Sequence, residues 1–110
     1  MIYKVLVEAT ARTDALEYAE FLLESSKSAT VVEKWLRELE SSIQELEELP
    51  HRYRTIDEQP HFSIELRQFI YHSHRVIFHI NEARGTVHVL RIYHANRDEL
   101  IPGLLPEEIG

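Results

Sequence analysis

Residues 64–97 read IELRQFIYHSHRVIFHINEARGTVHVLRIYHANR, and this stretch decides the fold. Apolar side chains take alternate positions in residues 75–80, which is typical of a half-buried strand. Residues 81–85 then supply turn-forming side chains, and Gly85 is free to adopt a positive φ. Residues 86–93 are apolar at both odd and even positions, which indicates a strand buried on both faces of a sheet.

The alternation within residues 86–93 predicts which side chains share a face. Val87 and Val89 are expected on one face, and Leu90 and Ile92 on the other. Because a strand buried on both faces needs a neighbour on each side, we expect this strand in the middle of the sheet.

The chain before this stretch begins with a short strand at residues 2–8, followed by a helix that Thr10 or Thr13 could cap. The buried stripe of this first helix is expected to comprise Leu16, Ala19, Leu22 and Leu23. Residues 25–28 are polar and end it.

A second helix is the clearest element of the sequence. Thr30 and Glu33 have the spacing of a capping box at its start, and Pro50 ends it. Its apolar residues recur every three or four positions: Val32, Trp35, Leu36, Leu39, Ile43, Leu46 and Leu49. The two helices should form an antiparallel hairpin, and a strand at residues 62–70 follows a polar loop.

These elements predict an α+β fold with the order β-α-α-β-β-β. The first strand has no short connection to a partner, so the simplest arrangement pairs it in parallel with the last strand. We expect a helix hairpin packed on a four-stranded mixed, mostly antiparallel sheet. At 110 residues, the chain is expected to form a single domain over residues 1–110.

Composition narrows the class of protein further. The chain has no cysteine, which excludes disulfides and thiol chemistry. It opens directly into a strand without a signal-like apolar segment, and no apolar run approaches the roughly 20 residues of a membrane span. We therefore expect a soluble cytoplasmic protein that needs no cofactor and does not contact a membrane.

The formal net charge of −7 is unevenly distributed. Residues 1–49 carry five Lys/Arg and eleven Asp/Glu, whereas residues 50–97 carry seven Arg, four Asp/Glu and all seven histidines. Residues 98–110 add four acidic residues and no basic one. A locally basic region on an acidic protein favours a confined anionic site over an extended nucleic-acid footprint.

Four basic residues are candidates for such a site: Arg67, Arg75, His94 and Arg97. Strand ends and a hairpin could bring them around one anion, where arginine binds phosphate bidentately and histidine transfers protons near neutral pH. The alternative is that they are ordinary charges at strand ends, some paired with Glu65, Asp98 or Glu99.

Other chemistry has less support. His72 and His74 could share a face and contact zinc, but no further ligand is suitably spaced, so exposed hairpin histidines are favoured. The glutamates of the second helix indicate a solvated face. With only three glycines and no nucleophile motif, the sequence does not favour nucleotide hydrolysis or serine hydrolysis.

The chain resembles the RelE/ParE-like toxins of bacterial type II toxin–antitoxin modules along nearly its whole length. The resemblance rests on the opening Tyr3-Lys4-Val5, the second helix with Pro50 and Arg52, and three later segments: Leu66-Arg67, His74-Arg75-Val76-Ile77-Phe78, and Val89-Leu90-Arg91-Ile92-Tyr93-His94 followed by Arg97-Asp98. The family has a helix hairpin on a mostly antiparallel sheet, as predicted above.

The resemblance implies a toxin that arrests growth, can stabilise plasmids and is neutralised by a cognate antitoxin protein. RelE-like members cleave mRNA in the ribosome without a metal, which requires proton transfer and stabilisation of a pentacovalent phosphate. Arg75 matches the family's phosphate-binding arginine and His94 lies near a catalytic position, whereas Arg67 and Arg97 match more loosely. ParE-like members instead inhibit DNA gyrase and are not enzymes.

Two departures from the RelE-like pattern favour the ParE-like class: the lysines that some RelE-like enzymes use on the second strand are absent, and the protein is acidic. A third departure is His74, which stands where the family often has a tyrosine. The sequence therefore favours gyrase inhibition, with an mRNA endonuclease as the alternative and an inactive, antitoxin-binding relative as a third hypothesis. Substitution of Arg75 by Ala should lower nuclease action by orders of magnitude, whereas a binding inhibitor should lose little activity unless the fold suffers.

Overall fold

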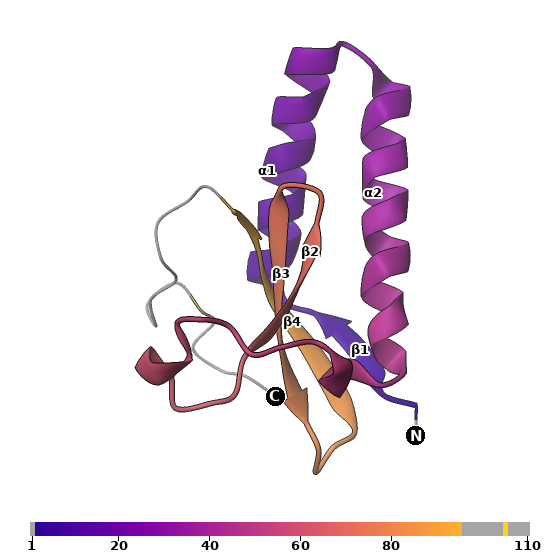
Figure 1. The fold of residues 1–110 in the computed structure, drawn as a ribbon. Helices are drawn as coiled ribbons and strands as arrows, with labels where there is room; N and C mark the ends of the chain where they lie inside the picture. The colour runs from indigo at the N-terminus through magenta and orange to yellow at the C-terminus, as the bar shows by residue number, and fades with distance from the viewer. Residues whose placement is uncertain (1, 96–104, 106–110) are drawn as a thin grey trace.

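The computed structural model of the chain describes residues 2–95 and residue 105. Its elements follow the predicted β-α-α-β-β-β order (Figure 1). They are β1 (Lys4–Val7), α1 (Ala9–Ser26), α2 (Ala29–Gln44), β2 (Arg67–Tyr71), β3 (His74–Asn81) and β4 (Thr86–His94), with the short 3-10 helices η1 (Glu45–Glu47), η2 (Pro50–Arg52) and η3 (Gln59–His61) between α2 and β2.

The four strands form one sheet in the order β1-β4-β3-β2. β1 pairs in parallel with β4, whereas β2–β3 and β3–β4 pair antiparallel, which confirms the predicted topology. Gly85 has a φ of 64° in the turn between β3 and β4, as its position predicted. The helices stand side by side as a hairpin against one face of the sheet (Figure 1).

The sheet separates two hydrophobic clusters. On the helix side, Trp35, Leu39 and Ile43 of α2 pack on the sheet, as the spacing of the second helix predicted. On the other side, the segment between η2 and β2 covers a smaller cluster of Ile56, Leu66, Ile77, Leu90 and Tyr93. β4 is therefore buried on both faces, as expected for a central strand.

A bulge between β3 and β4 changes which side chains share a face. Ile77 pairs with Arg91 and Phe78 with Val89, so Leu90 is an extra residue in β4. As a result, Ile92 joins the helix-side cluster together with Val87 and Val89. The prediction that Ile92 shares a face with Leu90 is wrong for this reason.

The predicted stripe of α1 is also wrong in part. The buried residues of α1 are Ala11, Ala15 and Ala19, whereas Leu16 and Leu23 are exposed. Small alanine side chains let the backbone of α1 lie close to β4 and α2. Leu16 and Leu23 consequently lie on the side of the helix that faces solvent, whereas Leu22 is partly buried against the core, as predicted.

The helix starts use different residues from those predicted. Glu8 occupies the N-cap position of α1, and the Thr10 hydroxyl instead donates to the Leu90 carbonyl at 2.7 Å. At the start of α2, the Ser28 hydroxyl accepts a hydrogen bond from the backbone N–H of Val31. The predicted Thr30 capping box does not form, because the helix begins before it.

The strand predicted at residues 62–70 starts later, at Arg67. The side chain of Gln59 donates to the carbonyl of Ile64 and accepts from the N–H of Leu66, both at 2.7 Å. These side-chain bonds satisfy backbone groups that a strand would have paired. Residues 62–66 therefore cover the smaller cluster without being part of the sheet.

Candidate functional site

Arg75 lies on β3, on the sheet face away from the helices, and its guanidinium is bound by two neighbours. Its two terminal nitrogens donate to the two carboxylate oxygens of Glu58 at 2.8 Å each. Its Nε donates to the side-chain oxygen of Gln68, also at 2.8 Å. Only 15% of the Arg75 side chain and 6% of the Glu58 side chain are exposed. The positive charge of Arg75 is thus neutralised by a carboxylate of the same chain.

The segment between η2 and η3 places Glu58 beside Arg75. The backbone N–H of Ile56 donates to the Leu66 carbonyl, and that of Gln68 donates to the Arg54 carbonyl. The Ile56 side chain is buried in the smaller cluster. These contacts hold the segment against β2, so Glu58 belongs to the folded structure rather than to a free loop.

His94 ends β4 on the opposite face of the sheet from Arg75. Its registered partner is His74, and the centroids of the two imidazole rings lie 5.0 Å apart. The bulge at Leu90 causes this placement, because strict alternation would have put His94 on the face of Arg75. The predicted pairing of Arg75 and His94 at one anion therefore does not form.

His74 is buried, not exposed as the sequence suggested. Its ring lies 4.3 Å from that of Tyr18 and 5.6 Å from that of Trp35, measured between centroids. Burial, with a smaller contribution from His94, lowers the pKa of His74 to about 4. His74 is therefore neutral at pH 7.

The two remaining candidates lie elsewhere or outside the described residues. Arg67 pairs with Phe78, towards the other end of β2, where it donates to the carbonyls of His51 and Tyr53 and contacts Glu65 at 2.9 Å. Arg97 lies outside the described residues. Arg67, Arg75 and His94 are consequently in three different surroundings.

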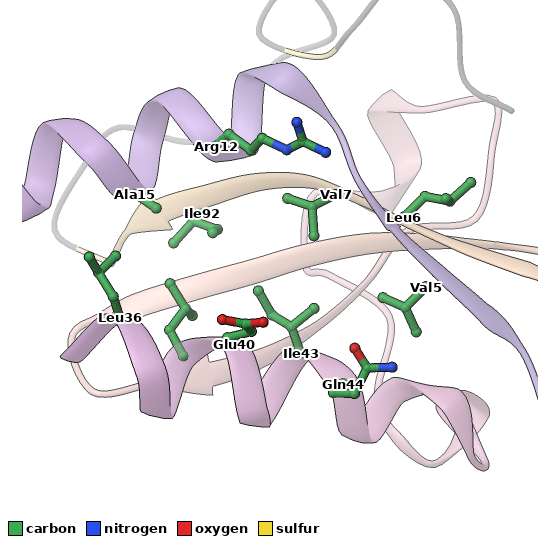
Figure 2. Close-up of a pocket in the computed structure, with 11 residues that line it drawn as sticks. Val5, Leu6, Val7, Arg12, Ala15, Leu36, Glu40, Ile43, Gln44 and Ile92 are labelled. Carbon is green, nitrogen blue, oxygen red and sulfur yellow. The ribbon is translucent and has the colours of Figure 1, made fainter. Parts of the chain in front are cut away.

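A groove that the sequence did not reveal lies between the helix hairpin and β1 (Figure 2). Its volume is about 550 Å³, and its walls are mainly aliphatic, with charged or polar groups at Arg12, Glu40 and Gln44. The aliphatic residues come from β1, both helices and β4: Val5, Leu6, Val7, Ala15, Leu36, Leu39, Ile43 and Ile92. Mainly aliphatic walls of this kind can receive the apolar face of a helix, as in helix-in-groove recognition.

Among the described residues, β1 has a neighbouring strand on one side only, so its other edge, beside the groove, pairs with no described strand. The backbone N–H groups of Lys4 and Glu8 donate towards β4. Because successive N–H groups of a strand point in opposite directions, those of Val5 and Val7 point away from the sheet. The groove therefore combines aliphatic walls with an open strand edge.

Neither a metal centre nor a membrane segment is evident in the part of the chain that the structure describes. Residues 2–95 and 105 contain no group of three His, Asp or Glu side chains placed to hold a metal ion. Within the same residues, no helix is long and apolar enough to cross a membrane.

The helix hairpin on a four-stranded mixed sheet is the fold that the resemblance to RelE/ParE-like toxins implied. A family model described as the ParE toxin of the type II toxin–antitoxin system parDE matches residues 5–99. Since this match spans most of the chain, the chain belongs to that family.

A solved structure has the same fold. It is a chain of the toxin–antitoxin complex RelBE2 from Mycobacterium tuberculosis, which is 18% identical, with a TM-score of 0.57. The match covers 86% of the present chain and 99% of that chain. No curated protein sequence is significantly similar.

Two features of the candidate site could not be found in the sequence. Glu58 stands in a polar stretch that contains no recognisable motif, and the groove is formed by residues far apart in the chain. The spacing of Leu36, Leu39 and Ile43 predicted an apolar helix face, but not that part of this face remains open.

Proposed function

We propose that this protein is a ParE-like toxin that inhibits DNA gyrase by surface contact, without catalysis, and that a cognate antitoxin neutralises it. The observation that carries the proposal is the paired state of Arg75, whose guanidinium is bound by Glu58 and Gln68. The match to the ParE family model points the same way. DNA gyrase is cytoplasmic, so the protein is proposed to act in the cytoplasm.

Metal-independent RNA cleavage needs a cation that is free to stabilise the charge developing on the phosphate. To bind Arg75, a phosphate would have to displace Glu58 and break the buried, doubly hydrogen-bonded ion pair between the two side chains. Breaking a buried ion pair in this way costs about 3–5 kcal/mol. A single oxyanion donor contributes only about 3–4 kcal/mol to catalysis. Replacing Glu58 by a phosphate at Arg75 would therefore give no net stabilisation of the transition state, which disfavours the endonuclease.

The neighbouring histidines do not compensate for the paired arginine. His94 faces the helices, on the other side of the sheet from Arg75, and its neighbour His74 is neutral at pH 7. A general acid or base must lie within hydrogen-bonding reach of the reacting atoms. His94 and Arg75 cannot approach one phosphate together from opposite faces.

The groove between β1 and the helix hairpin is the proposed antitoxin site. Its aliphatic walls would receive the apolar face of an antitoxin helix, and Arg12 and Glu40 would contact polar groups at its margins (Figure 2). The open N–H groups of Val5 and Val7 could bind an extended segment. This site is separate from Arg75, so neutralisation by antitoxin would not require contact with Arg75.

The proposal is tested by inducing the protein alone in bacteria and following the incorporation of labelled thymidine and methionine. Inhibition of gyrase predicts that thymidine incorporation falls first, while methionine incorporation continues. An early loss of methionine incorporation would instead support mRNA cleavage. If growth is unaffected although the folded protein accumulates, the chain would be an inactive relative that only binds an antitoxin.

A further inference from the structure

A small cavity lies beside the end of β4, on the flank of α1 that faces away from the groove. It has a volume of about 170 Å³ and is lined by side chains of α1, β3 and β4: Asp14, Glu17, Tyr18, Phe21, His74, Ile92 and His94. Pockets for whole small molecules usually begin at roughly 300 Å³. A cavity of this size suits the end of one side chain presented by a larger partner.

The charges around this cavity exclude an anion. Glu17 is exposed, and its charge makes only a minor contribution to the raised pKa of Arg91, which Asp14 dominates. The Asp14 carboxylate is bound by Arg91, which offsets its charge. Because His74 is neutral, the described carboxylates leave the cavity with a net negative character. The surroundings of His94 thus oppose the anion binding that its sequence position suggested.

The walls of the cavity provide what a cation requires. The rings of Tyr18 and Phe21 lie 5.7 Å apart between centroids, and 60% of Phe21 is exposed. Aromatic faces attract cations, and a flat guanidinium group also stacks on them. A neutral imidazole offers an acceptor nitrogen to an N–H donor. Glu17 supplies the compensating charge.

The surface of α1 beside the cavity is acidic, which favours a basic partner. Glu20 and Glu24 are exposed on the same side of α1 as Glu17 and form an acidic margin beside the cavity. This margin repels nucleic acid, and it would also repel the same face of a second copy of the chain. A basic protein segment has the complementary charge.

We propose that this cavity is a binding site for an arginine side chain in a basic segment of a partner protein. The guanidinium stacks on the exposed ring of Phe21 and pairs with Glu17. The site lies on the opposite flank of α1 from the groove, so one toxin molecule can bind an antitoxin and this segment separately. The inference does not depend on whether the target is gyrase or the ribosome.

The test uses the full chain and three short capped peptides that contain paired arginines, paired lysines or paired glutamates. Trp35, the chain's single tryptophan, lies 4.9 Å from Tyr18 between ring centroids, so its fluorescence reports occupancy. The arginine peptide should give saturable binding that weakens with salt. The lysine peptide should bind more weakly, and the glutamate peptide should not bind.

Glu17→Gln and Phe21→Ala should each weaken binding of the arginine peptide roughly fivefold. Both side chains are exposed, so the variants should fold normally, which their circular dichroism would verify. Glu45→Gln, which removes an exposed carboxylate far from the cavity, is the matched control and should bind like the parent. The proposal is overturned if Glu17→Gln binds the arginine peptide as well as the parent does. It is also overturned if binding does not saturate, or if the glutamate peptide binds.

Discussion

Both carboxylate oxygens of Glu58 accept hydrogen bonds from the terminal nitrogens of Arg75, at 2.8 Å each. The pair lies between the sheet and the segment that precedes β2, where little of either side chain is exposed. Arg75 matches a phosphate-binding arginine by its sequence position, but here its guanidinium forms an ion pair within the folded chain. This relationship determines the first prediction.

Removal of one partner of this pair should destabilise the fold strongly. Glu58→Leu or Arg75→Leu should each lower the free energy of unfolding by about 3–5 kcal/mol, because each breaks the buried ion pair and leaves one charged side chain without the other. The double variant should recover most of this loss, since no buried charge then remains. Urea denaturation of the four proteins measures the coupling, and simple additivity of the single losses would show that the pair does not interact.

The buried His74 should make stability depend on pH. Its pKa is about 4 in the folded state and near 6.5 in an unfolded chain, so the unfolded state binds the proton first. The contribution of neutral His74 to the free energy of unfolding is fully present above pH 6.5. It is lost as the pH falls towards 4, by up to about 3 kcal/mol.

Thermal denaturation between pH 7 and pH 4 measures this dependence. His74→Phe removes the titrating group and keeps a ring against Tyr18, so the variant should lose less stability over that range than the parent. His72→Gln changes an exposed histidine that makes the smallest contribution to the lowered pKa of His74, so it should retain most of the parental slope. If the parent and His74→Phe have identical slopes, His74 does not account for the pH dependence.

Substitutions on α1 should reveal which of its sides is packed. Ala15 is buried against the core, so Ala15→Leu should destabilise the protein by about 1–3 kcal/mol through overpacking. Leu16 is 59% exposed, and Leu16→Ala should change the free energy of unfolding by less than about 0.5 kcal/mol. If urea denaturation instead shows a larger loss for Leu16→Ala than for Ala15→Leu, the buried face of α1 is the one predicted from the sequence.

The groove should be sensitive to charge if it binds the antitoxin. Leu36→Glu places a carboxylate on its aliphatic wall and should weaken neutralisation by co-expressed antitoxin at least roughly tenfold, because an unpaired charge would be buried. Leu49→Glu adds the same charge at an exposed position outside the groove and should be neutralised like the parent. Antitoxin titration in a growth assay compares them, and equal neutralisation would place the antitoxin elsewhere.

The sequence predicted the strand order and α2 because these depend on local periodicity and chain connectivity. α2 packs along one face only, so Trp35, Leu39 and Ile43 recur at helical spacing. α1 carries apolar residues around much of its circumference, and the pattern did not distinguish its packed alanines from its exposed leucines.

The candidate site was harder to predict, because one extra residue in β4 changed the face of the sheet on which His94 lies. The bulge at Leu90 turns His94 to the helix side, away from Arg75. Nothing in the local pattern marks this bulge, since β4 is apolar at both parities. The position of Glu58 depends in turn on hydrogen bonds made by the Gln59 side chain, which are tertiary contacts.

The central claim is tested most directly by adding the purified protein to DNA gyrase, ATP and relaxed plasmid, and measuring supercoiling. A parallel reaction measures cleavage of mRNA on translating ribosomes. We predict that the parent and the doubly substituted Glu58→Leu, Arg75→Leu protein both inhibit supercoiling, and that neither cleaves mRNA. Undisturbed supercoiling together with mRNA cleavage that is lost in the double variant would contradict it.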